Sequence, residues 1–268
     1  MKLLLYLAYD GVHFCGYQAQ PNGVTVQQTL NIATKALFGT DCDITGCSRT
    51  DSGVHAHMFC ATVTQKGTQH LHTTIPTDKI PRALNIHLPD SIAAWQADWV
   101  SEDFHPRYSV SSKMYEYRIL NTPHRSPFEV GRSWHLPQVL DDHAIELMNQ
   151  GAQYMVGKRD YSACMASGCS VEDKVRDVSF ASVTREGDFV VFRVRADGFL
   201  YHMVRIMTGT LVDVALGKID VATLPARLDS LDRRQMGRTA PPEGLYLHKV
   251  YYDDPQNPGY RGGERHES

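Results

Sequence analysis

Residues 49–56 read Arg-Thr-Asp-Ser-Gly-Val-His-Ala, a short run that brings an acid, a base and two hydroxyl groups together. Asp51 is followed by Ser and Gly, which favour turns. Residues 42–47 before it predict a strand, and residues 57–64 after it alternate as a strand with one buried face does. The run therefore predicts a loop between two strands that presents Asp51 on a rigid support.

Three interpretations of this loop stay open on its residues alone. A solvated aspartate in a hairpin turn is the simplest, because short motifs match by chance. Asp51-Ser52-Gly53 also matches the triplet of aspartic proteases, which need two carboxylates, but the chain has no second such triplet. His55 and His57 beside Asp51 would suit a metal-dependent hydrolase, yet two histidines do not make a site and no third ligand is identifiable.

The composition is that of an ordinary globular protein. The chain has 268 residues, of which 42% are hydrophobic and 21% charged, enough for one large core or two small ones. A formal net charge of −3 does not indicate a nucleic-acid partner, although a basic patch on one face would still allow one. The apolar start at residues 3–9 is closed by Asp10 and predicts a buried strand, and no stretch is long enough to cross a membrane.

The six cysteines contain no Cys-x-x-Cys pair, which argues against a zinc ribbon or a thioredoxin-like site. Their scatter suits buried thiols in a reducing cytosol. Cys164 and Cys169 lie in a polar stretch where a metal site is conceivable, and the sequence does not decide their role.

The first half predicts the order β-α-β-β-α-β. Thr25 and Gln28 form a capping box at the start of its long helix, and Gly39 ends that helix. The predicted elements are a strand at 3–9, a helix at 25–39, strands at 42–47 and 57–64, a helix at 76–84 and a strand at 92–100.

The second half predicts strands, helices and a long polar stretch. They are a strand at 113–119, a loop at 121–133, a helix at 141–156 ended by Gly157, a mobile polar segment at 158–173, a hairpin of 175–184 with 189–196, a helix at 199–216, a short helix at 221–230, a strand at 245–252 and a frayed tail from 253. Arg193 and Arg195 share one strand face, which indicates an RNA platform or a solvated surface. Arg205 lies in the middle of the most apolar helix, so it must reach solvent or a carboxylate.

Residues 49–56 closely resemble the signature loop of the tRNA pseudouridine synthase A family, usually Gly-Arg-Thr-Asp-Ala-Gly-Val-His-Ala. Ser48 and Ser52 replace its first Gly and its Ala, and Tyr17 stands where Trp is frequent. The resemblance spans roughly Leu3 to Tyr252. Other similar segments follow in the family's order, at 10–20, 104–108, 115–119, 198–205 and 242–246.

This resemblance implies an α+β fold made of two RRM-like or ferredoxin-like halves. The halves would share one extended, mostly antiparallel sheet, with helices on one face and a central RNA-binding cleft. The expected domains are 1–104, which carries the Asp51 loop, 105–252 as the second half, and 253–268 as the tail.

The same resemblance implies an isomerase that converts uridine to pseudouridine at positions 38, 39 and 40 in the anticodon arm of tRNA. Asp51 would be the nucleophile and Arg49 would assist base flipping. Tyr115 would stack on the target base, and Arg205 would form an ion pair with Asp51. A non-catalytic RNA-binding module is the alternative, because it would not need Asp51.

The resemblance also assigns Leu245 and Arg107 to substrate binding. An ordinary core leucine and a structural arginine near a domain junction are the alternative interpretations of these two positions. No cofactor is expected, because the isomerisation needs neither redox change nor an energy source. The expected partners are tRNA and a second copy of the chain, in the cytoplasm and without a membrane.

Overall fold

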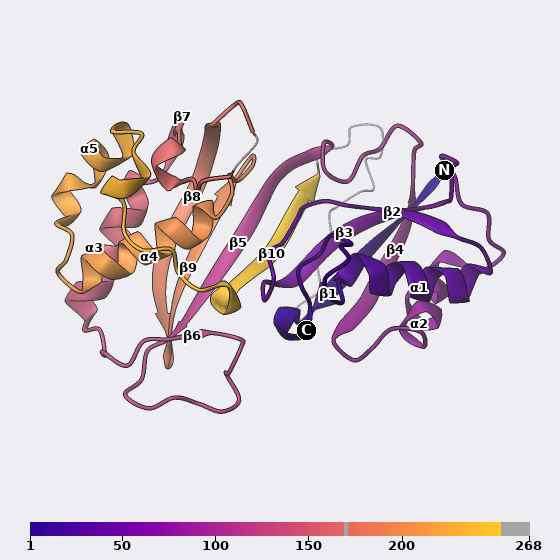
Figure 1. Ribbon diagram of the computed structural model, residues 1–268, viewed down its shortest axis with the longest axis horizontal. Helices are drawn as coiled ribbons and strands as arrows, with labels where there is room; N and C mark the ends of the chain where they lie inside the picture. Colours follow the sequence, from indigo (N-terminus) through magenta and orange to yellow (C-terminus); the bar gives the residue numbers. More distant parts are fainter. Residues whose placement is uncertain (169–170, 253–268) are drawn as a thin grey trace. The chain divides into compact units, whose positions relative to one another are not determined.

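The computed structural model describes residues 1–168 and 171–252. By its contacts the chain divides into two compact units, drawn together in Figure 1. The first unit is Met1–Ser111 with the final strand from Leu247, and the second is Ser112–Tyr246. The sequence instead placed the limit at 104 and the whole final strand in the second half.

The first unit has the predicted β-α-β-β-α-β order. Its elements are β1 (Lys2–Tyr9), α1 (Val26–Phe38), β2 (Cys42–Gly46), β3 (His55–Gln65), α2 (Ile80–Asn85) and β4 (Ile92–Val100), with one-turn 3₁₀ helices at Gly11–His13 and Thr77–Lys79. The helix expected at 76–84 is therefore α-helical only in its second part. Its first turn is the 3₁₀ helix, whose first residue follows Pro76.

β1 lies inside the sheet of the first unit and pairs antiparallel with β3 on one side and β4 on the other. The strand order is β4-β1-β3-β10, where β10 is Leu245–Tyr252, and β2 also pairs with β3. Residues 3–7 are fully buried. A central strand covered on both faces reads as an unbroken apolar run, and the buried strand predicted at the start of the chain is confirmed.

α1 has the ends that its sequence predicts. The Thr25 hydroxyl accepts the N–H of Gln28, and the Gln28 side chain accepts the N–H of Thr25, so the capping box is closed. Gly39 ends the helix in the left-handed conformation, with φ of 69°. Between these ends, the buried residues Val26, Leu30 and Ala33 define the face of α1 that packs inward.

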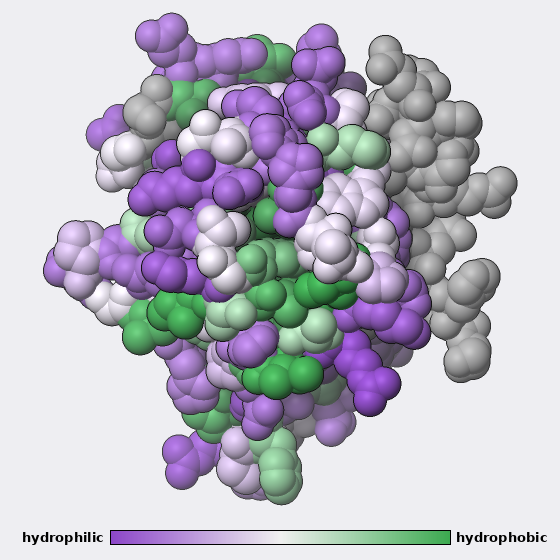
Figure 2. Space-filling view, turned by 90° about the vertical axis from the view of Figure 1, so that its right-hand side faces the viewer, coloured by the Kyte–Doolittle hydropathy of each residue, from purple (hydrophilic) through white to green (hydrophobic). Residues whose placement is uncertain are grey.

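The side of the first unit drawn in Figure 2 carries a band of apolar side chains between hydrophilic ones. Exposed apolar residues of this unit include Ile32 on α1, which is 71% exposed, and Ile86 after α2, which is 78% exposed. A contiguous exposed apolar area on a globular protein often marks an interaction surface.

The second unit contains most of β5 and the elements that follow it. They are β5 (Val110–Leu120), β6 (Trp134–His135), α3 (Asp142–Tyr154), β7 (Gly157–Asp160), β8 (Val175–Glu186), β9 (Phe189–Ala196), α4 (Met203–Ala215) and α5 (Leu224–Asp229). The strand order is β5-β9-β8-β7, antiparallel throughout, and β6 lies parallel beside β5. α3 packs on β8 and on α4. A mixed α+β fold with a mostly antiparallel sheet is confirmed.

Two predictions for the second unit were wrong. The helix expected from 199 begins only at Met203, because His202 adopts a left-handed conformation with φ of 59° that cannot continue a helix backwards. The segment 158–173 is not simply a mobile loop. It starts with β7, for which Gly157 is the first residue rather than a helix end, and Tyr161 is buried and donates hydrogen bonds to the carbonyls of Met155 and Gly157.

Cys164, in the same segment, is fully buried, and burial raises the pKa of its thiol to about 12. A thiol that stays protonated is a poor metal ligand. Cys169 and the tail from residue 253 lie outside the described residues. Within residues 1–168 and 171–252, no helix combines the length and apolarity needed to cross a bilayer.

The segment that leads from α5 to β10 is fastened to α4 by an ion pair. Asp213 accepts hydrogen bonds from Nε and Nη2 of Arg238, at 3.0 and 2.6 Å. Burial opposes ionisation of Asp213, but these hydrogen bonds outweigh it and hold its pKa below the usual value. Gly209 makes the close approach possible, since a Cβ there would lie 1.9 Å from the Arg238 carbonyl oxygen.

Asp213→Asn is expected to lower the free energy of unfolding by about 1–3 kcal/mol at neutral pH, because it weakens hydrogen bonds to a charged partner. A depressed folded-state pKa stabilises above the unfolded pKa, and this contribution is lost as the pH falls through the folded value. The difference between wild type and variant should therefore shrink below about pH 4. Urea unfolding at both pH values measures it, and an undiminished difference in acid would contradict the ion pair.

Candidate active site

The predicted loop between β2 and β3 is present, and it holds Asp51 in a half-buried position. The N–H of Val54 donates to the Asp51 carbonyl at 3.2 Å, which closes a turn, and Gly53 has φ of 78°. The backbone of the loop is thus a defined turn. At position 53 only glycine adopts the required left-handed conformation without strain. The prediction of a turn between two strands is confirmed.

The Asp51 loop is fastened to the end of β1 and to the segment after it. The Tyr9 hydroxyl and Thr50 Oγ1 form a buried hydrogen bond of 2.9 Å. The Thr50 carbonyl accepts the N–H of Tyr17 at 3.1 Å. Ser52, whose hydroxyl the family usually lacks, donates to the Phe14 carbonyl at 3.3 Å. These contacts lie on both sides of Asp51 and limit its backbone movement.

Two glycines let the segment 10–17 approach the Asp51 loop backbone to backbone. A Cβ on Gly11 would lie 2.2 Å from the Val54 carbonyl oxygen, and one on Gly16 would lie 2.7 Å from the Thr50 carbonyl oxygen. Gly16 also has φ of 82°, which other residues rarely adopt. No side chain fits between residues 10–17 and the Asp51 loop. The two stretches therefore form an interlock, in which neither can move without the other.

His55 acts as a structural acceptor in this interlock. It is 2% exposed, and its Nδ1 accepts the N–H of Gly11 at 3.0 Å. The Asp10 carboxylate lies 3.2 Å from the same nitrogen. In the neutral ring Nδ1 accepts the Gly11 N–H and carries no proton. The contact between Nδ1 and the Asp10 carboxylate is then not an ion pair. Within the described residues, Asp51, His55 and His57 do not gather as one ligand set.

A pocket of about 250 Å³ opens beside this loop in the first unit. Arg49 and Ser48 line one part of it, Tyr17 and Gly46 another, and the segment 105–108 a third. Arg49 and Arg107 are both exposed. The structure therefore brings together, in one hollow of the first unit, two of the arginines that the sequence assigned to RNA.

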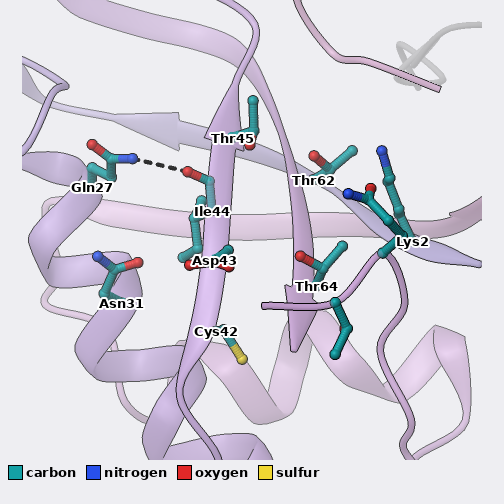
Figure 3. Close-up of a pocket in the computed structure, with 11 residues that line it drawn as sticks. Lys2, Gln27, Asn31, Cys42, Asp43, Ile44, Thr45, Thr62 and Thr64 are labelled. Atoms are coloured by element: carbon teal, nitrogen blue, oxygen red, sulfur yellow. Dashed lines mark hydrogen bonds between the residues drawn. The ribbon is translucent and has the colours of Figure 1, made fainter. Parts of the chain in front are cut away.

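A second and larger pocket of about 460 Å³ lies farther along β2, again within the first unit (Figure 3). Threonines of β2 and β3 line it together with Lys2 and Asp43. At its edge the Gln27 side chain donates to the Ile44 carbonyl at 2.8 Å. Gln27 thus satisfies an edge carbonyl of β2 that would otherwise be open to a further strand.

Tyr115 and Leu245 occupy the second unit. Tyr115 is 7% exposed on β5, and its ring meets Phe199 edge to face with centroids 5.0 Å apart. Leu245 is the first residue of β10 and is also 7% exposed. Both side chains are therefore buried within the second unit.

Arg205 lies in the first turn of α4 and not in the middle of a helix, because α4 starts late. Its Nε donates to the Ala240 carbonyl at 2.8 Å, and its own carbonyl accepts the N–H of Ala240 at 3.0 Å. The Tyr117 hydroxyl donates to the next carbonyl, that of Pro241, at 2.6 Å. Arg205 therefore joins the first turn of α4 to the segment that leads into β10.

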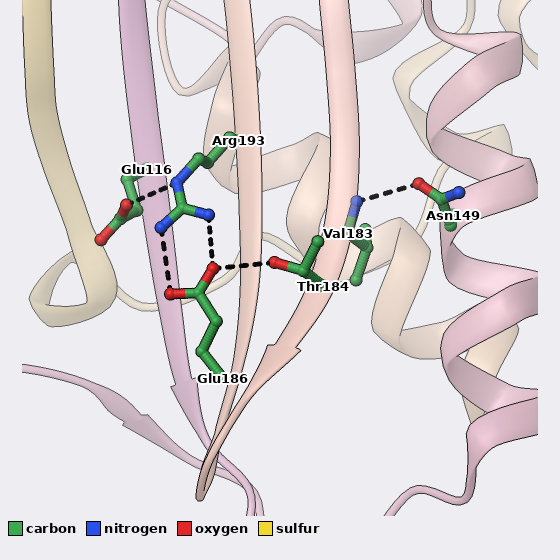
Figure 4. Close-up of polar contacts among 6 residues, drawn as sticks. All are labelled: Glu116, Asn149, Val183, Thr184, Glu186 and Arg193. Atoms are coloured by element: carbon green, nitrogen blue, oxygen red, sulfur yellow. Dashed lines mark hydrogen bonds and ion pairs between the residues drawn. The ribbon is translucent and has the colours of Figure 1, made fainter.

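The arginine-bearing face of β9 is not an unpaired cationic platform. Figure 4 shows Arg193 between two carboxylates, with Nε 2.8 Å from Glu116 and Nη1 2.5 Å from Glu186. Hydrogen bonds from Arg193 lower the pKa of Glu186, so this acid stays charged. Arg195 donates to the Ser112 hydroxyl at 2.8 Å. Both arginines are half-buried and bonded within the second unit, which argues against the RNA platform without making this face a solvated surface.

The supporting residues were the ones that sequence reasoning missed. Tyr9, Thr50 and His55 hold the loop, but only Asp10-Gly11 and the glycines after it gave a signal, as a segment of the family resemblance. Tyr108 and His105 lie beside Arg107 in the segment 104–108, and the resemblance assigned neither of them a role. A buried hydroxyl pair across 41 residues leaves no local pattern from which it could be found.

Gly16→Ala and Gly67→Ala form a matched pair for the interlock. Both glycines have left-handed backbones, with φ of 82° and 75°, but an added Cβ meets nothing within 4 Å at Gly67. Gly67→Ala should cost only the backbone strain of about 1–2 kcal/mol. Gly16→Ala should cost about 1–3 kcal/mol more, because the Thr50 carbonyl must move. Urea unfolding compares them, and equal losses would show that the two segments are not interlocked.

A family model described as tRNA pseudouridine synthase matches residues 6–109 and 152–253 of the chain. Proteins named tRNA pseudouridine synthase A from Thermoanaerobacter sp. (strain X514) and from Acetivibrio thermocellus are each 42% identical to it, over 94% and 92% of this chain and 99% and 98% of theirs. One from Bacillus pumilus is 39% identical over 95% of this chain and all of its own. The chain therefore belongs to the tRNA pseudouridine synthase family, a family of isomerases that act on uridine in tRNA.

Proposed function

We propose that the chain converts uridine to pseudouridine at positions 38, 39 and 40 in the anticodon arm of tRNA. The observation that carries this proposal is the interlocked loop of Asp51, which has the family's signature and a backbone fixed on both sides. The family and its curated relatives support the reaction, and the positions in the anticodon arm rest on the sequence resemblance.

The reaction breaks the bond from C1′ to N1 and forms one from C1′ to C5. N1 gains a proton and C5 releases one, so the isomerisation is balanced without a cofactor. A carboxylate must act on the ribose, either by attack at C1′ or by removal of the 2′ hydrogen. Asp51 is the proposed carboxylate, and a fixed loop serves it because misplacement by about 1 Å costs about 100-fold in rate.

The target base is stacked within RNA and has to be flipped out. Arg49 is two residues from Asp51 and exposed, so it is the proposed group that holds the flipped nucleotide or fills its place. Tyr115, fixed by Phe199, would stack on the base, and Leu245 would pack beneath it. Arg107 would contact a phosphate.

Arg205 is the proposed partner that keeps Asp51 ionised. A dry pocket raises the pKa of a carboxylate, while a nearby guanidinium lowers it. Arg205 uses Nε for the Ala240 carbonyl, and the other nitrogens of a guanidinium carry four further N–H groups. The proposal rests on the resemblance.

The enzyme is further proposed to work in the cytoplasm as a homodimer with one tRNA across both subunits. The exposed apolar band of the first unit supports self-association. Light scattering that finds only monomer at working concentrations would rule the dimer out.

Asp51→Asn is expected to abolish the reaction without unfolding the chain, because it keeps the size of the side chain and removes its charge. An unmodified tRNA transcript with tritium at C5 of uridine reports each turnover by tritium release. Wild type should release tritium and the variant none, while tRNA binding by filter assay stays similar. Equal release by both would assign the chemistry to another carboxylate. Binding without release by wild type would leave the non-catalytic RNA-binding module.

The proposed ion pair is tested by a double-mutant cycle. Arg205→Ala should cost about 1.5–3 kcal/mol of unfolding free energy when Asp51 is present, because it removes a charged hydrogen-bond partner from a half-buried carboxylate. In an Asp51→Asn background the cost should fall to that of the lost hydrogen bond to Ala240, about 1 kcal/mol. Equal costs in the two backgrounds, measured by urea unfolding, would show that the two residues do not interact.

A further inference from the structure

The pocket of about 250 Å³ beside the Asp51 loop has an uncompensated positive charge. Arg49 and Arg107 both line it, and no acidic residue does. Neither arginine has an ion-pair partner among the described residues. The larger pocket on β2 differs, because Asp43 lines it together with Lys2. Two guanidinium groups without a carboxylate favour an anion, and phosphate oxygens match their planar donors.

Two rings that lie against each other, those of Tyr108 and His105, also line this pocket and are called the aromatic platform. Tyr108 is 76% exposed, and its ring lies against His105 with centroids 4.3 Å apart and planes inclined by 32°. The Arg107 guanidinium lies 5.9 Å from the Tyr108 centroid. A large exposed aromatic ring beside two cations is the combination with which proteins hold single-stranded nucleic acid, since bases stack on the ring and phosphates meet the cations.

His105 holds this platform in place. Its Nδ1 accepts the N–H groups of Arg107 and Tyr108, at 3.1 and 3.3 Å. Burial, together with the charges of Lys2 and Arg107, lowers the pKa of His105, so the ring stays neutral and can accept. The turn that carries Arg107 and Tyr108 is thus fixed before any ligand arrives.

We propose that this pocket holds one nucleotide of the RNA substrate next to the target uridine, with its phosphate between Arg49 and Arg107 and its base on the exposed face of Tyr108. The inference rests on the proposed function, since it takes the ligand to be RNA. Arg49 links the subsite to Asp51 through two residues of the same loop.

Stacking is tested by substitutions at Tyr108 with tRNA affinity as the readout. Tyr108→Ala should raise the Kd for an unmodified tRNA transcript by roughly 5- to 100-fold, and Tyr108→Phe, which keeps the ring, by less than about twofold. Phe128→Ala is the matched control, since Phe128 is 83% exposed but lines neither pocket. A wild-type Kd for Tyr108→Ala, or an equal loss for Phe128→Ala, would overturn the stacking role.

The phosphate contact is tested by salt dependence. Arg107→Gln should reduce the slope of log Kd against log salt concentration by about 0.7–0.9, the share of one phosphate. Arg82→Gln is the control, because Arg82 is exposed on α2 and lines neither pocket. An unchanged slope for Arg107→Gln would overturn the phosphate role.

Tritium release by wild type, measured in parallel, separates failure of this inference from failure of the proposed function. Release with wild-type affinity in both Tyr108→Ala and Arg107→Gln overturns the subsite alone. If the wild-type chain binds tRNA without tritium release, the proposed reaction is overturned. The Kd values of the variants then still test whether the pocket binds a nucleotide. A wild-type chain that neither binds nor releases overturns both.

Discussion

The backbone of residues 10–17 lies directly against the backbone of residues 50–54, and the candidate active site depends on this approach. Gly11 and Gly16 leave no room for a Cβ, so the two stretches cannot shift independently. The buried hydrogen bond between Tyr9 and Thr50 ties the same loop to β1, a strand that is buried on both faces. A reactive carboxylate on a surface turn would otherwise move with the turn. Here its backbone is positioned by a strand whose residues 3–7 are fully buried.

The second unit positions its functional candidates by a different means. Asp213 and Arg238 fasten the segment before β10 to α4, and Ala240 exchanges two hydrogen bonds with Arg205 on the same helix. His202 begins α4 with a left-handed backbone, a conformation that costs energy for any residue other than glycine. The strain delays the start of the helix and places Arg205 in its first turn. Strained residues of this kind tend to occur at functional sites.

Charge in this protein is informative only after pairing is known. The net charge of −3 would not suggest an RNA partner. Arg193, which looked like a candidate for RNA, lies between Glu116 and Glu186 and is neutralised by them. Arg49 and Arg107, by contrast, share a pocket that no acidic residue lines. The pocket beside the Asp51 loop is therefore lined by two cations and no acid, although the whole chain has a net negative charge.

The sequence by itself determined the class of most elements, the turn that carries Asp51 and the family. α1 could be predicted at both ends because a capping box and a terminal glycine are local signals, and the hairpin of β8 and β9 because alternation and a central glycine are local too. Prediction failed at the start of α4 and in residues 158–173, where His202 and the buried Tyr161 follow contacts beyond their neighbours.

Only the tertiary structure decided what supports Asp51, which arginines have an ion-pair partner within residues 1–168 and 171–252, and where Tyr108 lies. These features depend on contacts between residues far apart along the chain, such as Tyr9 with Thr50 and Tyr17 with Gly46. The physical reason is that periodicity and capping are set by neighbouring residues, whereas the approach of two backbones and the pairing of charges exist only once the chain has folded.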